Sequence, residues 1–292
     1  MKPIKIPKNV KTAITLLNQN NYECFLVGGA VRNALLNEPI HDYDLTTSAT
    51  PYQTMEVFKD YKVIETGIQH GTVTVRIDHE NIEITTYRLD STYSDHRRPD
   101  KVEFTTSLKE DCSRRDFTIN AMAYHPSIGL KDYFDGQTDL NKKIIRTVNE
   151  PNKRFEEDAL RILRAVRFSS RLGFEIEPCT KRAMIQTKED LKYVSVERIA
   201  TELFGILSSE HVDLGLLDNR MILEVILPEI KPYSNKEYET LVERMLYIPQ
   251  NTQHLFECRM AFLLEPLNDI KQAEDIIKRL KYPNIKIGRA HV

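Results

Sequence analysis

Two aspartates separated by a single tyrosine are the first residues of this sequence that could do chemistry. In an extended segment side chains alternate, so the carboxylates of Asp42 and Asp44 leave the same face. Two such carboxylates repel each other unless a cation lies between them. Their oxygens suit Mg²⁺, which takes one or two carboxylates and completes its shell with waters and substrate phosphates. The pair therefore predicts a magnesium site, although an Asp-x-Asp triplet by itself is also typical of a solvated turn.

A glycine pair precedes the aspartates, between an apolar run and a helical pattern. Residues 24–27 predict a buried strand, Gly28 and Gly29 interrupt it, and helical spacing continues to Leu36. Glycine lets a ligand approach the backbone, and the free N–H groups at a helix start favour an anion. Arg32 would add a charge-assisted contact. The turn therefore predicts a phosphate site beside the metal pair; taken alone, it is also compatible with a plain strand-to-helix turn.

A β-hairpin is predicted downstream of these motifs. The runs 72–77 and 82–87 are rich in β-formers and are joined by the polar turn 78–81. In the second strand Ile82 and Ile84 share one face, while Glu83 lies on the other. Glu83 is therefore a candidate third carboxylate for the metal site. The alternative is an exposed residue on an open sheet face.

The segments between the hairpin and residue 124 are polar or basic. The stretch 89–101 predicts a mobile loop, with a plain solvated connection as the alternative. The run 116–124 predicts a helix with Asp116 near its cap, which places Arg114 and Arg115 at an anion-favouring helix start. Two cations there are unfavourable unless phosphate is bound, so these arginines also point to a nucleotide.

A helix predicted for 155–171 has an uneven charge distribution. Its apolar residues fall on one side, and the opposite side carries Glu157 with four arginines: Arg161, Arg164, Arg167 and Arg171. So many cations on one face repel one another. The face therefore predicts an anionic partner such as a nucleotide or an RNA 3′ end, with a solvated charged stripe as the alternative.

Asp158 lies at the edge of that face, one turn before Arg161, and the two residues predict a choice of base. Cytosine and adenine present an amino donor beside a ring-nitrogen acceptor, whereas uracil and guanine present a carbonyl beside an N–H donor. An aspartate accepts and an arginine only donates. The pair therefore fits C and A and leaves unpaired groups against U and G.

The composition fits an intracellular protein with more than one domain. With 292 residues, 41% of them hydrophobic, the chain can bury a sizeable core. The formal net charge of −2 excludes a uniformly basic nucleic-acid binder, so any RNA contact must come from a local patch. The four cysteines are far apart and indicate reduced thiols. We find no signal-peptide pattern and no stretch long enough to span a bilayer, and therefore expect a cytoplasmic protein without membrane association.

The order of these motifs resembles a known family. Gly28-Gly29-x-x-Arg32 followed by Asp42-x-Asp44 is similar to the nucleotidyltransferase motif of the DNA polymerase beta superfamily. The form is that of bacterial tRNA CCA-adding enzymes and their poly(A) polymerase relatives. The resemblance continues, in the family's order, through three further runs: 114–123, 157–161 and 195–199. One position departs from the family pattern, because Asn33 stands where an aspartate is common.

The resemblance implies an α+β fold in which a mixed β-sheet head is followed by helices. It implies a nucleotidyltransferase head at 1–150, a helical neck that recognises the base at 151–210, and a helical body at 211–292. Family members usually continue further along the chain, so we expect this body to be truncated, with a natural short form as the alternative. The helical pattern is lost over 283–292.

The resemblance also implies roles for individual residues. Asp42 and Asp44 would bind Mg²⁺, while Glu83 is a candidate catalytic carboxylate from its place in the hairpin and not from the resemblance. The nucleotide would contact a larger set: Gly28, Gly29, Arg32, Arg115, Asp116, Asn120, Asp158, Arg161, Arg164 and Arg167. In relatives the loop matching 89–101 takes part in the change from C to A addition, and the run matching 195–199 supports the neck.

The expected function is template-independent addition of C, C and A to the tRNA 3′ end from CTP and ATP, with release of pyrophosphate. A poly(A) polymerase, or an enzyme that adds only CC or only A, is the alternative within the family. From a different class, the alternative is a catalytically silent RNA-binding protein. The intact acid pair argues against the last of these, because repelling carboxylates are costly without a metal. The sequence leaves the oligomeric state open.

Overall fold

The computed structural model describes residues 3–90 and 102–282, which form two compact units. Residues 3–90, 102–142 and 146–149 make up the first, the head unit; residues 143–145 and 150–282 make up the second, the helical unit. Most of the stretch predicted as a mobile loop, 91–101, and the last residues, 283–292, lie outside the described residues.

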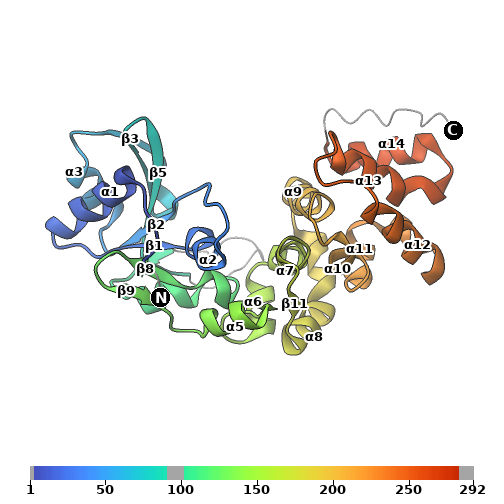
Figure 1. Cartoon of the computed structure of the whole chain (residues 1–292), viewed down its shortest axis with the longest axis horizontal. Coiled ribbons are helices and arrows are strands. Elements are labelled where there is room, and N and C mark those ends of the chain that lie inside the picture. Colours follow the sequence, from blue (N-terminus) through green and yellow to red (C-terminus); the bar gives the residue numbers. More distant parts are fainter. Residues whose placement is uncertain (1–2, 91–101, 283–292) are drawn as a thin grey trace. The chain divides into compact units, whose positions relative to one another are not determined.

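The head unit is built on one mixed sheet. Among the described residues, seven strands form it in the order β3-β4-β5-β2-β1-β8-β9 (Figure 1). The strands are β1 (Cys24–Val27), β2 (Leu45–Thr47), β3 (Lys62–Gly67), β4 (Thr72–Ile77), β5 (Glu80–Thr86), β8 (Ala123–His125) and β9 (Gly129–Lys131). The β2–β5 pair is parallel and the other neighbours are antiparallel. With the helices that follow, this sheet confirms the predicted α+β class.

The hairpin of β4 and β5 confirms the predicted alternation of side chains. Val73 and Val75 of β4, with Ile82 and Ile84 of β5, are buried, because these apolar positions share one face of the pleat. Glu83 lies on the opposite, solvent-facing side. The turn residues 78 and 79 both have positive φ, 50° and 68°, as tight two-residue hairpin turns require.

Helices flank the head sheet, and a small second sheet completes the unit. The helices are α1 (Lys8–Gln19), α2 (Gly29–Leu36), α3 (Pro51–Val57), α4 (Leu108–Ser113) and α5 (Gly136–Lys142). The single-turn 3₁₀ helices are η1 (Ile68–His70) and η2 (Thr118–Asn120), and the small sheet pairs β6 (Arg88–Asp90) with β7 (Val102–Phe104).

The helix predicted for 116–124 is wrong. The segment holds only the short η2, and its end forms β8, which pairs with β1 through Leu26 and Val27. Asp116 accepts a hydrogen bond from the N–H of Phe117 at 2.8 Å, so its side chain competes with helical backbone bonding. Pairing with a buried strand then outweighs local helix propensity.

The helical unit consists almost entirely of helices, as the sequence predicts. They are α6 (Pro151–Glu157), α7 (Leu160–Leu172), α8 (Pro178–Thr187), η3 (Lys188–Tyr193), α9 (Val196–Leu207), α10 (Val212–Leu216), α11 (Arg220–Ile226), η4 (Pro228–Ile230), α12 (Asn235–Leu246), α13 (Leu255–Leu264), η5 (Glu265–Leu267) and α14 (Ile270–Arg279) (Figure 1). The unit also holds a parallel pair of two-residue strands, β10 (Ile144–Ile145) and β11 (Glu175–Ile176).

The single helix predicted for 155–171 is interrupted at one residue. Asp158 has φ −150° and ψ 100°, an extended conformation between α6 and α7. Its Oδ1 accepts a hydrogen bond from the N–H of Leu160 at 3.2 Å, so the carboxylate replaces part of the helical bonding at the start of α7. Asp158 therefore sits at a break and is not one more position on a continuous helical face.

Candidate active site

The glycine turn between β1 and α2 has the geometry that a close ligand approach requires. Gly28 has φ +68°, and a Cβ built on it would lie 3.5 Å from Nη1 of Arg115. No side chain within the described part of the chain caps the N-terminus of α2, which begins at Gly29. Its first amides therefore remain available to an anion, as the sequence predicted.

The two glycines should differ sharply in their tolerance of alanine. We expect Gly28→Ala to lose about 1–3 kcal/mol in free energy of unfolding, because an L-residue is strained at φ +68° and ψ −134°. It should also weaken CTP binding, because the turn distorts. Gly29→Ala is the matched control, since its Cβ would make only ordinary contact, 3.5 Å from Nη2 of Arg32. Urea unfolding and CTP titration measure both effects; equal unfolding free energies for the two variants would contradict the argument.

The acid pair lies at the N-terminal end of β2 and directly beside this turn. Asp42 and Asp44 precede the strand and do not lie within it. The N–H of Val27, the residue before the glycines, donates to the carbonyl of Asp44 at 3.0 Å. In the β2–β5 pair Leu45 is level with Ile84, so continuing this parallel register places Asp44 level with Glu83. The fold therefore brings both aspartates and Glu83 to one hollow of about 560 Å³.

The electrostatics of this hollow suit a cation. The side chain of Asp44 is exposed on one side. Protein atoms on the other sides of its carboxyl replace water and raise its pKa, and the charges of Glu83 and Asp42 raise it further. Arg115 opposes the shift only in part. A divalent ion would offset this repulsion, so the residues present fit one. Among the described residues no set of three His, Cys, Asp or Glu side chains is arranged to hold a metal, so ligation by Glu83 remains a prediction.

Arg32 lies in a buried hydrogen-bond network behind the turn. Its side chain is 3% exposed, and Nη1 donates to Oδ1 of Asn120 at 2.6 Å. Nε and Nη2 donate to Oδ1 of Asn33 at 3.1 and 2.8 Å. Asn120 in turn donates to Oδ1 of Asp116 at 3.1 Å. The amide of Asn33 thus accepts from Arg32 where the family commonly has a carboxylate, and the network ties α2 to η2.

Arg114 and Arg115 meet at a carboxylate that the sequence reasoning missed. Asp111 of α4 accepts from Nη2 of Arg114 at 2.8 Å and from Nη2 of Arg115 at 3.2 Å. A sequence signal for this contact existed. Asp111 precedes Arg114 by three residues and Arg115 by four, and side chains at these spacings are neighbours on a helix. Arg115 therefore belongs to the same unit as the glycine turn and the acid pair.

In the helical unit, the two residues predicted to read the base each have a partner in the chain. Oδ2 of Asp158 accepts from Nη2 of Arg198 at 2.7 Å, with the aspartate side chain 16% exposed. Nη1 of Arg161 donates to Oε2 of Glu157 at 2.5 Å and to the carbonyl of Arg154 at 3.0 Å. Arg198 lies in α9, in the run that the sequence analysis left out of the site.

The arginine face of α7 carries less uncompensated charge than predicted. Arg167 pairs with Glu202 of α9, and its guanidinium lies 4.6 Å from the ring centre of Phe168. A Cβ at Gly205 would approach Cδ of Arg167 to 2.3 Å, so a larger residue there would displace the arginine side chain from this position. Arg164 also lies over Phe168, at 5.5 Å. Glu157 was already counted on this face, whereas Glu202 was missed because it comes from a distant helix.

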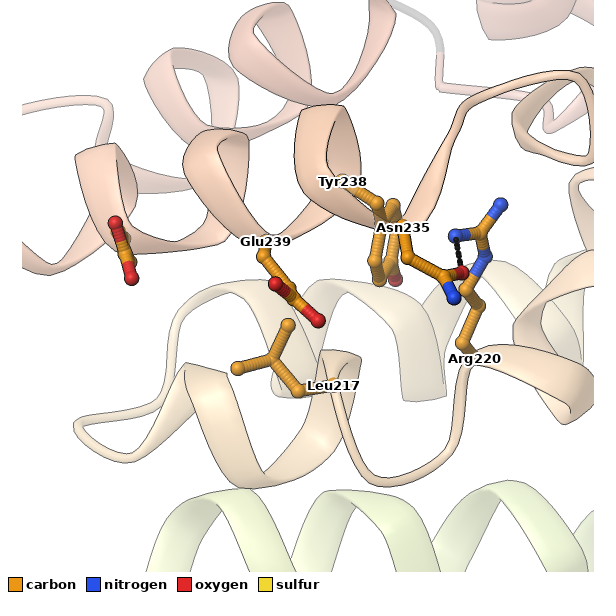
Figure 2. A pocket seen from close by; sticks show the side chains of 6 residues that line it. Leu217, Arg220, Asn235, Tyr238 and Glu239 are labelled. Atoms are coloured by element: carbon orange, nitrogen blue, oxygen red, sulfur yellow. Dashed lines mark hydrogen bonds between the residues drawn. The ribbon is translucent and has the colours of Figure 1, made fainter.

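A second hollow, of about 410 Å³, lies in the helical unit beside α12 and is structural. It is lined by Leu217, Arg220, Asn235, Tyr238, Glu239 and Glu243 (Figure 2). Arg220 donates to Oδ1 of Asn235 at 3.0 Å and to Oε1 of Glu224 at 2.9 Å, and it lies 4.7 Å from the ring centre of Tyr238. Its cation is thus used in joining α11 to α12.

In this mixed sheet the glycine turn at the end of β1 lies beside the acid pair that precedes β2, and the buried Arg32 lies behind the turn. This arrangement is that of a nucleotidyltransferase head. The family comparison agrees: residues 24–146 match the poly A polymerase head domain, and 173–234 match the probable RNA and SrmB- binding site of polymerase A. The chain belongs to this family of poly(A) polymerases and CCA-adding enzymes. Among the described residues no helix is long and apolar enough to cross a membrane.

Similar curated relatives are named CCA-adding enzymes. The chain is 50% identical over 219 residues to that of Oceanobacillus iheyensis, covering 75% of this chain and 54% of the relative. It is 42% identical over 255 residues to that of Pediococcus pentosaceus, covering 85% and 62%. The chain thus spans little more than half the length of these relatives.

Solved structures agree in fold. The Bacillus stearothermophilus CCA-adding enzyme in complex with CTP has a TM-score of 0.79 and 35% identity, covering 95% of this chain and 66% of that one. A tRNA nucleotidyltransferase complexed with a primer tRNA and an incoming ATP analogue has a TM-score of 0.74 and 26% identity, covering 93% and 80%.

Proposed function

We propose that this chain catalyses the template-independent addition of C, C and A to tRNA 3′ ends, from CTP and ATP, in the cytoplasm. The observation that carries the proposal is the backbone bond from Val27 to Asp44, which fixes the acid pair beside the glycine turn. The names of the relatives, and the nucleotide and tRNA in the titles of the related structures, support the choice of substrates.

The acid pair is the proposed metal site. Nucleotidyltransferases of this family generally use divalent metal ions, and we assign Mg²⁺, held by Asp42 and Asp44. Such ions, when bound, supply activation of the 3′-hydroxyl and stabilisation of the leaving pyrophosphate. Glu83 adds negative charge beside the pair, which strengthens the attraction for a cation.

The head unit is proposed to hold the triphosphate. The first amides of α2, freed by Gly28 and Gly29, donate to phosphate oxygens, and Arg115 adds positive charge beside Gly28. Arg32, with Asp116 and Asn120, holds the turn in shape from behind. This division separates residues that contact the anion from residues that fix the backbone.

The start of α7 is proposed to read the base. Each carboxylate oxygen of Asp158 has capacity for a further hydrogen bond, because Oδ2 accepts from Arg198 and Oδ1 from the N–H of Leu160. The amino group of C or A takes one of these positions, and Arg161 donates to the adjacent ring nitrogen. Arg164 and Arg167 supply positive charge along the same helix. In this proposal residues 151–210 form the base-reading neck and 211–292 the body.

Product analysis tests the function and its alternatives together. The chain is incubated with each single NTP and with tRNAs that end before CCA, after C and after CC. C addition to the first two substrates and A addition to the third supports full CCA addition. Repeated A addition indicates a poly(A) polymerase, whereas addition at only some of the ends indicates a CC- or A-adding enzyme. RNA binding without any transfer would contradict the enzyme proposal.

A further inference from the structure

Asp111 of α4 is a buried carboxylate outside the predicted site, with an unusual number of donors around it. Its side chain has no exposed surface. Oδ1 accepts from Nε and Nη2 of Arg114 at 3.0 and 2.8 Å and from the N–H of Arg88 at 3.3 Å. Oδ2 accepts from Nη2 of Arg115 and from Oγ1 of Thr46, at 3.2 and 3.1 Å.

This carboxylate is ionised although it is buried. Burial works to raise the pKa of Asp111, but the guanidiniums of Arg114 and Arg115 outweigh it and hold the pKa below its usual range. A buried charge is tolerated only when it is paired and hydrogen-bonded. The buried carboxylate of Asp111 therefore needs the donors around it, and its negative charge in turn holds those donors in place.

The partners on Oδ2 come from two functional segments. Arg115 lies against the glycine turn, because its Nη1 is 3.5 Å from the position of a Cβ on Gly28. Thr46 follows Asp44 by two residues in β2, and its hydroxyl also lies 3.1 Å from the carbonyl of Thr85 in β5. One oxygen of Asp111 thus links the triphosphate arginine to the strand that carries the acid pair.

The carboxylate of Asp44 can compete with that of Asp111 for the guanidinium of Arg115. The charge of Arg115 lowers the pKa of Asp44, so the two side chains interact electrostatically. Nε of Arg115 is buried and has no hydrogen-bond partner among the described residues, so the guanidinium is held from one end, by Asp111. Without that anchor it would turn toward the carboxylates of the metal site and neutralise them.

We propose that Asp111 is a positioning residue that holds Arg115 at the glycine turn and away from Asp44, and thereby keeps the triphosphate site and the acid pair separate. The inference rests on the proposed nucleotide transfer, because it assigns Arg115 to the triphosphate. Asp111 itself contacts neither substrate nor metal in this role. Its effect on the triphosphate passes through Arg115, and Thr46 helps to hold the carboxylate of Asp111 in place.

The test is a binding experiment on the full chain with Asp111→Asn. The asparagine amide keeps the shape of the side chain, but it has one acceptor oxygen where the carboxylate has two. Its NH₂ group, which only donates, therefore faces either Arg114 or Arg115. We expect the Kd of CTP, measured with Mg²⁺ by calorimetry, to rise about tenfold or more, as for loss of a charge-assisted contact. The Kd of CMP, which lacks the β- and γ-phosphates, should change much less. Glu110→Gln on the same helix removes an equal charge at an exposed position and should change neither affinity.

A double-mutant cycle separates positioning from general loss of structure. If Asp111 acts through Arg115, then Asp111→Asn added to Arg115→Met should weaken CTP binding no further than Arg115→Met alone. Additive losses, or equal losses for CTP and CMP, would overturn the inference.

If Asp111→Asn does not fold, Thr46→Val carries the test. Thr46→Val keeps the shape of the side chain but removes one hydrogen-bond partner of Oδ2. It should therefore raise the Kd of CTP by a smaller factor than Asp111→Asn. An unchanged Kd of CTP would overturn the proposal. A parent chain that binds no CTP at all would instead refute the proposed function.

Discussion

Asp44→Ala is expected to abolish nucleotidyl transfer while the protein folds as the parent does. The pKa of the carboxyl is raised by desolvation from surrounding protein atoms and by the charges of Glu83 and Asp42, so in the absence of metal its charge is repelled by its neighbours. Removing it relieves that repulsion and at the same time removes a metal ligand. We expect single-turnover rates with Mg²⁺ to fall by about three powers of ten or more, the scale of losing metal-ion stabilisation of developing charge. The thermal midpoint should stay the same or rise.

A carboxylate in the same hollow provides the matched control. Glu80 lines the hollow but pairs with Nδ2 of Asn9 at 2.8 Å and has no assigned role in transfer. Glu80→Gln should therefore leave the rate near that of the parent. Glu83→Gln distinguishes the two interpretations of Glu83: a large loss supports a catalytic carboxylate, and a mild one a structural residue. Near-normal turnover of Asp44→Ala with Mg²⁺ would refute the metal-site assignment.

The parts of the site that the sequence could predict are those whose signals are local. The glycine turn, the acid pair and the hairpin each occupy a few consecutive residues, and their spacing alone fixes which side chains share a face. Asp44 and Glu83 are 39 positions apart in the chain, yet strand alternation and parallel pairing of β2 with β5 bring them level. The sequence named Glu83 as a candidate because alternation placed it opposite Ile82 and Ile84.

The parts that the sequence could not predict depend on partners far along the chain. Arg198 and Glu202 of α9 neutralise Asp158 and Arg167 of the α7 region, and nothing in the periodicity of either helix shows that they meet. The excess of arginine on α7 was therefore interpreted as a demand for a ligand anion, with a solvated charged stripe as the alternative. The carboxylates of the chain itself meet part of that demand.

The two wrong helix predictions share one physical cause. At Asp116 and at Asp158 a carboxylate bonds to a nearby backbone N–H and replaces helical bonding, an alternative that periodicity does not register. In both cases the aspartate belongs to the candidate site. Local rules fail at these residues because their side chains are placed for interactions other than continuing a helix.

Replacing Asp158 is expected to change which nucleotide is added more than it changes the affinity for the triphosphate. In the proposed reading Asp158 accepts from the amino group of C or A, and Arg161 donates to the ring nitrogen. Uracil and guanine are rejected because they leave buried polar groups unpaired, at about 1–3 kcal/mol for each group, roughly one to two powers of ten in selectivity. Asp158→Ala should lose that discrimination. Asp158→Asn, which can also donate, should shift misincorporation toward UTP and GTP further still.

The bond between Asp158 and Arg198 makes a second measurement necessary. Nη1 of Arg198 is buried and has no hydrogen-bond partner among the described residues, so deleting the aspartate leaves this cation poorly paired and should lower the thermal midpoint. Arg198→Gln breaks the same pair but keeps the carboxylate that reads the base. If Asp158 reads the base, Arg198→Gln lowers stability while primer extension with the four NTPs still favours CTP and ATP. If Arg198→Gln relaxes selectivity as much as Asp158→Ala does, or if Asp158→Ala slows all four nucleotides equally, then Asp158 supports the start of α7 and another residue chooses the base.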